Sequence, residues 1–307
     1  MKTLIILTAS LFLTLLLVNP FAVSAEKKIQ VVATIADMAD FAKQIGGDKV
    51  EVKSIFKGQT DAHFFEPLPS HVIELQKADI LIVGGLEVDF WAKGLIDASR
   101  NPDIKFGKPG YIDPSDGIKP KQVPAGGRID GSMGDVHPLG NPHYWFTPEN
   151  VEIAVRNICK GLVRVDPENK DYYEANTEKY IDEVKRTFDE LKSSLAKYKS
   201  IKIIQYHTSW DYFADAFGLE IVGSIEPKPG VPPTPSHLSQ LVKSAGKNEN
   251  LLILAEPYYP RKPIDFVVKN TSAKALRLHV YLGSKGSGAT YLDNLRKNIE
   301  SIAEAVK

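Results

Sequence analysis

Short apolar, β-branched runs alternate with amphipathic segments along both halves of this chain, and this alternation constrains the fold more than any other feature. Strands separated by helical crossovers pair in parallel, so each half predicts a small α/β domain built on a parallel sheet. The predicted strands are, in chain order, 30–33, 50–56, 80–83, 201–206, 220–225, 251–255 and 276–281.

The strongest helical pattern lies between the two halves, over 168–199. Its apolar residues recur mostly at steps of three or four, or sums of these: Tyr173, Tyr180, Val184, Phe188, Leu191, Leu195 and Tyr198. At about 1.5 Å per residue such a helix is about 45 to 50 Å long, enough to join two domains rigidly. A coiled-coil dimer is the alternative, but one isolated helix more often packs on its own domains. We therefore expect a monomer.

These patterns divide the chain into four parts. We predict a signal peptide over 1–25, an N-terminal α/β lobe over 26–166, a connecting helix over 167–200 and a C-terminal α/β lobe over 201–307. Within the first lobe, the segment 107–140 is rich in Gly, Pro and Asp and poor in apolar residues. That composition predicts a long surface loop.

The N-terminal residues have the composition of a secretory signal peptide. Lys2 precedes an apolar run over 4–18, and the small residues at 23–25 indicate cleavage after Ala25. An uncleaved anchor is the alternative, but the run is shorter than the roughly 20 residues of a membrane span. The one cysteine, Cys159, is far from the cleavage site, so we expect neither a lipoprotein nor an internal disulfide. The expected location is the periplasm.

The charges of the chain are balanced. There are 38 Lys and Arg against 38 Asp and Glu, and removing residues 1–25 takes away only Lys2, which leaves 37 against 38. This balance provides no electrostatic footprint for nucleic acid or for an anionic membrane surface.

Three of the seven histidines occupy places where α/β proteins bind ligands. His63 follows the second predicted strand, His207 ends the first strand of the second half, and His143 follows Asn141-Pro142. Ligands bind outside the carboxyl ends of parallel strands, so His63 and His207 should face one crevice from opposite sides. A single His is more often a structural residue, but three imidazoles together favour zinc over manganese, which prefers carboxylate oxygens.

The fourth ligand is open between a carboxylate and water. Glu256 directly follows the strand predicted over 251–255 and would complete a tetrahedral site. Alternatively, Glu256 orients nearby backbone and water fills the position, which is a normal zinc arrangement. His137, in the predicted loop, is a candidate for transient metal recruitment, although a solvated side chain is the simpler expectation. His279 is expected to pack on one face of the last strand.

These residues resemble those of the ZnuA/TroA-like family, the bacterial zinc- and manganese-binding proteins of metal ABC transporters. The likeness covers essentially the whole chain after residue 25. It rests on Asp61-Ala62-His63 with Glu66-Pro67, on 141–145, on Tyr206-His207, and on 224–227 with Gly230 and Pro235-Ser236. The resemblance implies two α/β lobes joined by one long helix, with His63, His143 and His207 binding the metal between them. It also implies a permease with a cytoplasmic ATPase as partner, and no enzymatic activity.

The chain departs from this family at one ligand position. The family commonly supplies an Asp late in the second lobe, where this sequence reads Tyr281-Leu282-Gly283 and has no carboxylate. Glu256 is the candidate replacement. Manganese-preferring members look like they replace the third His by a carboxylate, whereas this chain keeps His207. We therefore expect zinc as the cargo, with manganese as the alternative.

Two other functions are alternatives to metal capture. A secreted zinc-dependent hydrolase also uses three His and a water, but it usually needs a positioned general base, and the chain has no His-Glu-x-x-His segment. An adhesin or structural surface protein would need no tight metal site. The expected function is capture of the ion and hand-over to the permease, with local loop movement rather than wide closure.

Overall fold

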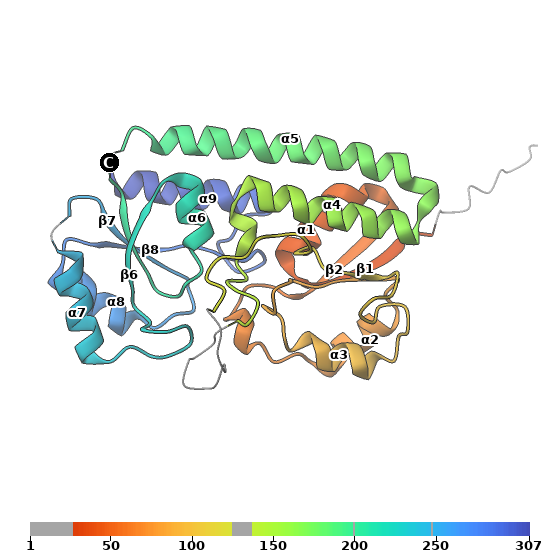
Figure 1. Ribbon diagram of the computed structural model, residues 1–307, viewed down its shortest axis with the longest axis horizontal. Helices are drawn as coiled ribbons and strands as arrows, with labels where there is room; N and C mark the ends of the chain where they lie inside the picture. The colour runs from red at the N-terminus through yellow and green to blue at the C-terminus, as the bar shows by residue number, and fades with distance from the viewer. Residues whose placement is uncertain (1–26, 125–136, 199, 247) are drawn as a thin grey trace, which may run out of the picture.

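The computed structural model describes residues 27–124, 137–198, 200–246 and 248–307 (Figure 1). The predicted signal peptide lies outside the described residues. Two four-stranded sheets form the centre of the two halves, in the orders β2-β1-β3-β4 and β6-β5-β7-β8. The pairings between neighbouring strands in these two sheets are parallel. The strands are β1 Ile29–Ile35, β2 Val50–Phe56, β3 Ile80–Ile82, β4 Tyr111–Ile112, β5 Lys202–Gln205, β6 Glu220–Ser224, β7 Leu251–Ala255 and β8 Lys274–Arg277.

Helices cover both faces of the sheets and form the outermost layer. The α-helices are α1 Ala36–Gly46, α2 Pro69–Gln76, α3 Ala92–Ser99, α4 Pro148–Val165, α5 Lys170–Leu195, α6 Asp211–Phe217, α7 Pro235–Ala245, α8 Arg261–Asn270 and α9 Tyr291–Ala305. α5 runs along the length of the molecule above α4 and α9, while α2 and α3 lie below one half and α7 and α8 below the other (Figure 1). The predicted α/β fold with two parallel sheets and one long helix is confirmed. Among the described helices, none has the length and apolar composition of a membrane span.

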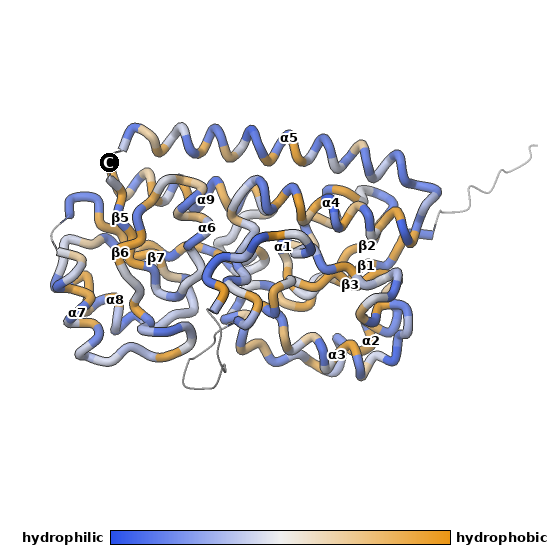
Figure 2. The backbone as a smooth tube through the Cα atoms, in the orientation of Figure 1, coloured by the Kyte–Doolittle hydropathy of each residue, from blue (hydrophilic) through white to orange (hydrophobic). Residues whose placement is uncertain are grey.

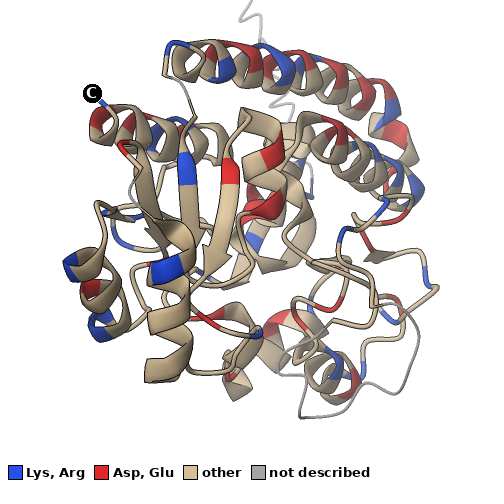
Figure 3. Ribbon diagram, turned by 60° about the vertical axis from the view of Figure 1, so that its left-hand side comes forward, with Lys and Arg blue, Asp and Glu red and all other residues tan. Residues whose placement is uncertain are grey.

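The apolar face of α5 packs inside its own chain. α5 contacts α1, α4, α6 and α9, and Phe188 stacks on Phe217 of α6 with ring centroids 5.4 Å apart. Its outer face carries alternating acidic and basic residues (Figure 3), and hydrophilic positions recur along its whole length (Figure 2). This packing accounts for the apolar pattern without a coiled coil. The helix has 26 residues and is shorter at both ends than the predicted 168–199.

The two halves share one apolar core instead of meeting at a thin hinge. A single cluster of buried side chains includes β1, α1, α4, α5 and α9. Hydrogen bonds also cross between the halves: Asp37 accepts the Leu282 N–H at 3.2 Å, and Asp40 accepts the Tyr291 N–H at 2.9 Å. A core-like contact of this kind opposes wide relative movement of the halves.

Two predictions about local structure are wrong. The strand predicted over 276–281 is β8, Lys274–Arg277, and the chain then turns away, where Leu278 and Val280 join the shared core. His279 therefore does not lie in a strand, and its Nδ1 pairs with Ser284 Oγ at 2.7 Å. The segment 107–140 is not only surface loop, because it contains β4, which pairs with β3. Residues 125–136 of that segment lie outside the described residues.

Replacing Phe188 by Ala should lower the free energy of unfolding by about 3 to 5 kcal/mol, because it leaves a cavity between α5 and α6. Lys192→Ala, on the exposed face of the same helix, should change it by less than about 0.5 kcal/mol. Guanidinium unfolding followed by circular dichroism measures both values. Equal effects of the two substitutions would contradict an inward-facing α5.

Candidate metal centre

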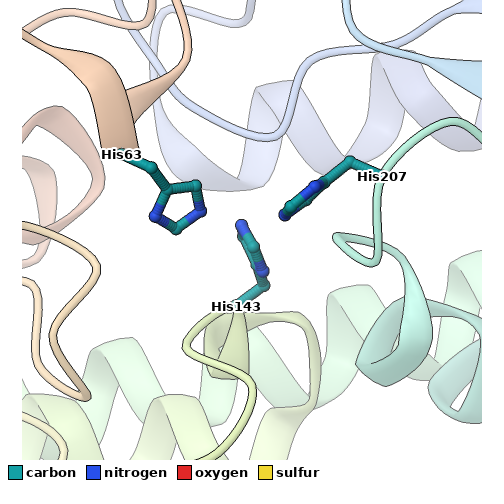
Figure 4. Close-up of side chains that lie close together, drawn as sticks. All are labelled: His63, His143 and His207. Carbon is teal, nitrogen blue, oxygen red and sulfur yellow. The ribbon is translucent and has the colours of Figure 1, made fainter. Parts of the chain in front are cut away.

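Three histidines from distant parts of the sequence come together between the two halves. His63, His143 and His207 each offer a ring nitrogen, and these nitrogens lie within 4.8 Å of one another. Each pair of ring centroids is 5.5 Å apart. The rings converge on one point from three separate elements (Figure 4). Since zinc–nitrogen bonds are about 2.0 to 2.1 Å long, the space between the rings has the size of one metal ion.

His63 lies on a short 3-10 helix, Ala62–Phe64, which follows β2. Asp61 caps this turn by accepting the His63 backbone N–H at 3.0 Å, and its other oxygen accepts the Tyr259 hydroxyl at 2.9 Å. Trp91 donates its indole N–H to the Ala62 carbonyl at 2.9 Å. The turn that carries His63 is therefore held by both halves of the molecule.

His143 directly precedes the 3-10 helix Tyr144–Phe146 and is only 2% exposed. Asn141 Nδ2 donates to the Thr208 carbonyl at 2.7 Å, which leaves Oδ1 facing His143. That oxygen lies 3.0 Å from both the backbone nitrogen and Nδ1 of His143. Because Oδ1 is an acceptor, Nδ1 carries the proton and Nε2 is the nitrogen available to a metal.

His207 follows β5 at its carboxyl end and is 3% exposed. Its Nδ1 lies 2.8 Å from Glu226 Oε2, in the segment that follows β6. Glu226 Oε2 also accepts the Gly230 N–H at 3.0 Å. Glu226 and Asn141 lie in segments that resemble the family, but their roles were not predicted from the sequence. The sequence did contain an indication that Glu226 lies near the site, because Glu226-Pro227 follows β6 much as Glu256-Pro257 follows β7.

The surroundings give the three imidazoles different proton affinities. The pKa of His63 is lowered to about 4, chiefly by burial; Asp61 opposes this shift and His207 adds to it. His63 is partly exposed as a residue, but both its ring nitrogens are buried. Burial, with His63 and His207 nearby, holds the pKa of His143 well below its usual value. Burial also lowers the pKa of His207, but the hydrogen bond and charge of Glu226 outweigh it and raise that pKa.

Glu256 lies beside this centre without joining the three nitrogens. Within the described part of the chain, the group of His, Cys, Asp and Glu atoms within 4.8 Å of one another contains the three histidines alone. Glu256 is completely buried; Ser209 lies close enough to act on its carboxylate, but neither oxygen forms a well-aligned hydrogen bond. Burial raises its pKa to about 7, while Ser209 and then His207 act in the opposite direction.

His137 is not the solvated loop residue that the sequence suggested. Its ring centroid is 4.6 Å from that of His63, and its Nε2 is buried. The Gly- and Pro-rich composition around His137 gave no indication that this residue lies beside His63. His71 and His237 make local contacts: His71 Nδ1 accepts the Leu68 N–H, and His237 Nε2 lies 3.0 Å from the Ser224 carbonyl oxygen.

Comparison with known proteins gives one family and a consistent set of relatives. The family model ZnuA, described as zinc-uptake complex component A, periplasmic, matches residues 31–305. The manganese ABC transporter substrate-binding lipoprotein PsaA of Streptococcus pneumoniae is 27% identical, covering 92% of this chain and 90% of that protein. The high-affinity zinc uptake system protein ZnuA of Bacillus subtilis is 25% identical, covering 91% and 88%. The iron-binding protein YfeA of Yersinia pestis is also 25% identical, covering 91% and 86%.

Solved structures of similar proteins have the same fold as this chain. A crystal structure of ZnuA superimposes with a TM-score of 0.75 at 27% identity, covering 92% of this chain and all of that one. A manganese-bound periplasmic metal-binding protein from Candidatus Liberibacter asiaticus gives 0.73 at 25% identity, covering 91% and 100%. The family and these relatives are metal-binding transport components and not enzymes, and they lend no support to the zinc-dependent hydrolase.

Acidification should destabilise the metal-free protein partly through His63. In the folded protein this ring stays neutral down to about pH 4, whereas in the unfolded chain it takes up a proton near pH 6.5. Between these values the unfolded chain binds the extra proton, so stability falls as the pH is lowered through this window, by on the order of 1 to 2 kcal/mol from this residue.

The matched variant for this effect is His63→Gln, which does not titrate. Urea unfolding of both metal-free proteins at pH 4.5 and pH 7 should show a smaller loss of stability for the variant. An identical pH dependence of the two proteins would refute the assignment of a neutral, buried ring to His63.

Proposed function

This chain belongs to the ZnuA family of periplasmic zinc-uptake components, and we propose that it captures zinc in preference to manganese and delivers it to the permease of an ABC transporter. The family and the relatives establish the broader role, that of a substrate-binding protein for a metal ABC transporter. The proposed place of action is the periplasm, and the proposed partners are a membrane permease and its cytoplasmic ATPase.

The choice of zinc rests on the chemistry of the donors. The similar proteins are named for zinc, manganese and iron, so likeness alone does not select the ion. The convergence of three imidazole nitrogens carries the proposal, because nitrogen donors suit zinc, whereas manganese prefers carboxylate oxygens. His63, His143 and His207 are the proposed ligands.

We propose the Glu256 carboxylate as the fourth donor, either directly or through one water. A buried carboxylate without hydrogen bonds is unfavourable unless it faces a cation. Glu256 is such a group, and the charge of His207 acts on it. Tyr281 begins the segment in which the family Asp is missing. Its ring lies 6.3 Å from that of His143, and a phenol carries no charge with which to balance the ion.

Release of the ion to the permease should involve movement of the short segments that carry the proposed ligands and not rigid-body movement of the two lobes. The shared core and the hydrogen bonds from Asp37 and Asp40 lock the two halves. The ligands, by contrast, sit on two 3-10 helices and on the segment after β5. Docking on the permease needs to displace only one such segment in order to weaken the site.

Removal of any one of the three imidazoles should weaken zinc binding strongly. His63→Ala, His143→Ala and His207→Ala should each reduce the affinity by more than the roughly 10- to 100-fold typical of losing an outer-shell partner. His71→Ala, at the start of α2, is the matched control and should bind zinc as the native protein does. Competition with a chelator measures the affinities, and native affinity in all three variants would reject the proposed ligands.

The substitution Glu256→Gln tests whether the Glu256 carboxylate binds the metal or has only a structural role. The change keeps the volume and removes the charge, so zinc affinity should fall by about 10-fold or more. The raised pKa means that the folded protein holds the proton up to about pH 7 while the unfolded chain releases it near 4.5. The native carboxylate therefore destabilises the metal-free fold as the pH rises through this range.

The same variant should accordingly be at least as stable as native protein at pH 8 without metal, although it binds zinc less well. Thermal unfolding with and without zinc measures both effects. A Glu256→Gln protein with native zinc affinity would show that the carboxylate does not serve the ion.

A further inference from the structure

His207 differs from His143 in the group that lies behind its ring. Glu226 Oε2 is 2.8 Å from His207 Nδ1, and both side chains are buried, with 9% and 3% exposure. The corresponding partner of His143 Nδ1 is the neutral amide oxygen of Asn141. One ring of the cluster is therefore backed by a carboxylate and another by an amide.

The bonding of Glu226 Oε2 defines which His207 nitrogen carries the proton. This oxygen accepts the Gly230 N–H at 3.0 Å, so it acts as an acceptor at this position. An acceptor opposite Nδ1 requires a proton on Nδ1, which leaves the lone pair on Nε2 for the ion. The other tautomer would place an N–H in the space between the rings.

We propose that Glu226 is a positioning residue for metal capture, which holds His207 in the tautomer and orientation that present Nε2 to the ion. This inference rests on the proposed function, because it takes His207 as a ligand. A carboxylate behind a metal-bound imidazole also increases the electron density on the ligating nitrogen. Glu226 thereby adds negative charge to the site without replacing a nitrogen donor by oxygen.

Glu226 is itself fixed before any ion arrives. Its backbone N–H donates to the Tyr206 carbonyl at 3.0 Å, directly before His207 in the chain. Its side chain is tied to Gly230, whose φ of +72° suits glycine at this turn. The turn is closed by the pairing of Lys228 with Val231. Ligand, carboxylate and turn thus form one preorganised unit, which is the arrangement that a tight site requires.

Glu226→Gln tests the role of the carboxylate at nearly constant volume. An amide offers an acceptor or a donor to Nδ1, so it no longer enforces one tautomer. Zinc affinity should fall by about 10- to 100-fold, the range for loss of an outer-shell partner. X-ray absorption of the zinc-loaded variant should still show three imidazole ligands. Glu220→Gln, an exposed position on β6, is the matched control and should leave the affinity unchanged.

A second measurement needs no variant and reads the tautomer directly. Long-range proton–nitrogen NMR of the native metal-free protein, at a pH where His207 is neutral, should show the His207 ring with its proton on Nδ1. His207→Ala identifies the signals by their loss. Glu226→Gln should shift the population toward the Nε2–H form, which a merely structural role of Glu226 would not do.

The outcomes separate this inference from the proposed function. Native zinc affinity in Glu226→Gln, together with weak binding by His207→Ala, overturns the role of Glu226 alone. An Nε2–H tautomer in the native protein overturns it as well, whether or not the variant folds. Native affinity in His207→Ala instead removes His207 from the ligands, and with it the proposed set of donors.

Discussion

The metal centre depends on one constraint, the apolar core that the two halves share. His63 follows a strand of the first sheet and His207 follows a strand of the second, so their distance is set by how the halves pack. Trp145 and Tyr281 are buried in the same core, and the Trp145 indole donates to the Val280 carbonyl across the halves. A slip between the halves would open this core and lose close-packed contacts. The imidazoles are therefore held close together by side chains outside the proposed set of ligands.

The electrostatic surroundings of the three imidazoles favour binding of a cation. Burial keeps His63 and His143 neutral, which is the form that binds metal. Carboxylates surround the rings: Asp61 caps the turn of His63, Glu226 backs His207, and Glu256 is enclosed nearby. Without a cation the buried Glu256 carboxylate opposes folding as the pH rises, and the core offsets that effect. The proposed ion would relieve this unfavourable burial, so stability and affinity are linked through Glu256.

Much of the fold followed from local patterns. The strands predicted over 50–56 and 251–255 match β2 and β7, and four others differ by at most two residues at either end, because continuous apolar runs between helices leave few alternatives. The last predicted strand failed because its apolar residues pack against the other half and not within a sheet. The strand β4 was not predicted, because its two residues lie in a Gly- and Pro-rich stretch and are too few to show a periodic pattern.

The sequence by itself predicted the α/β class, the two parallel sheets, the long helix and the three histidines as candidate ligands. These features follow from periodicity and from position at strand ends, which are local properties. Only the tertiary structure brought His137 against His63, placed Glu226 behind His207 and enclosed Glu256 without joining it to the three nitrogens. These relations join residues that are distant in the chain or depend on side-chain direction. Both are set by the packing of the two halves, and no local pattern encodes them.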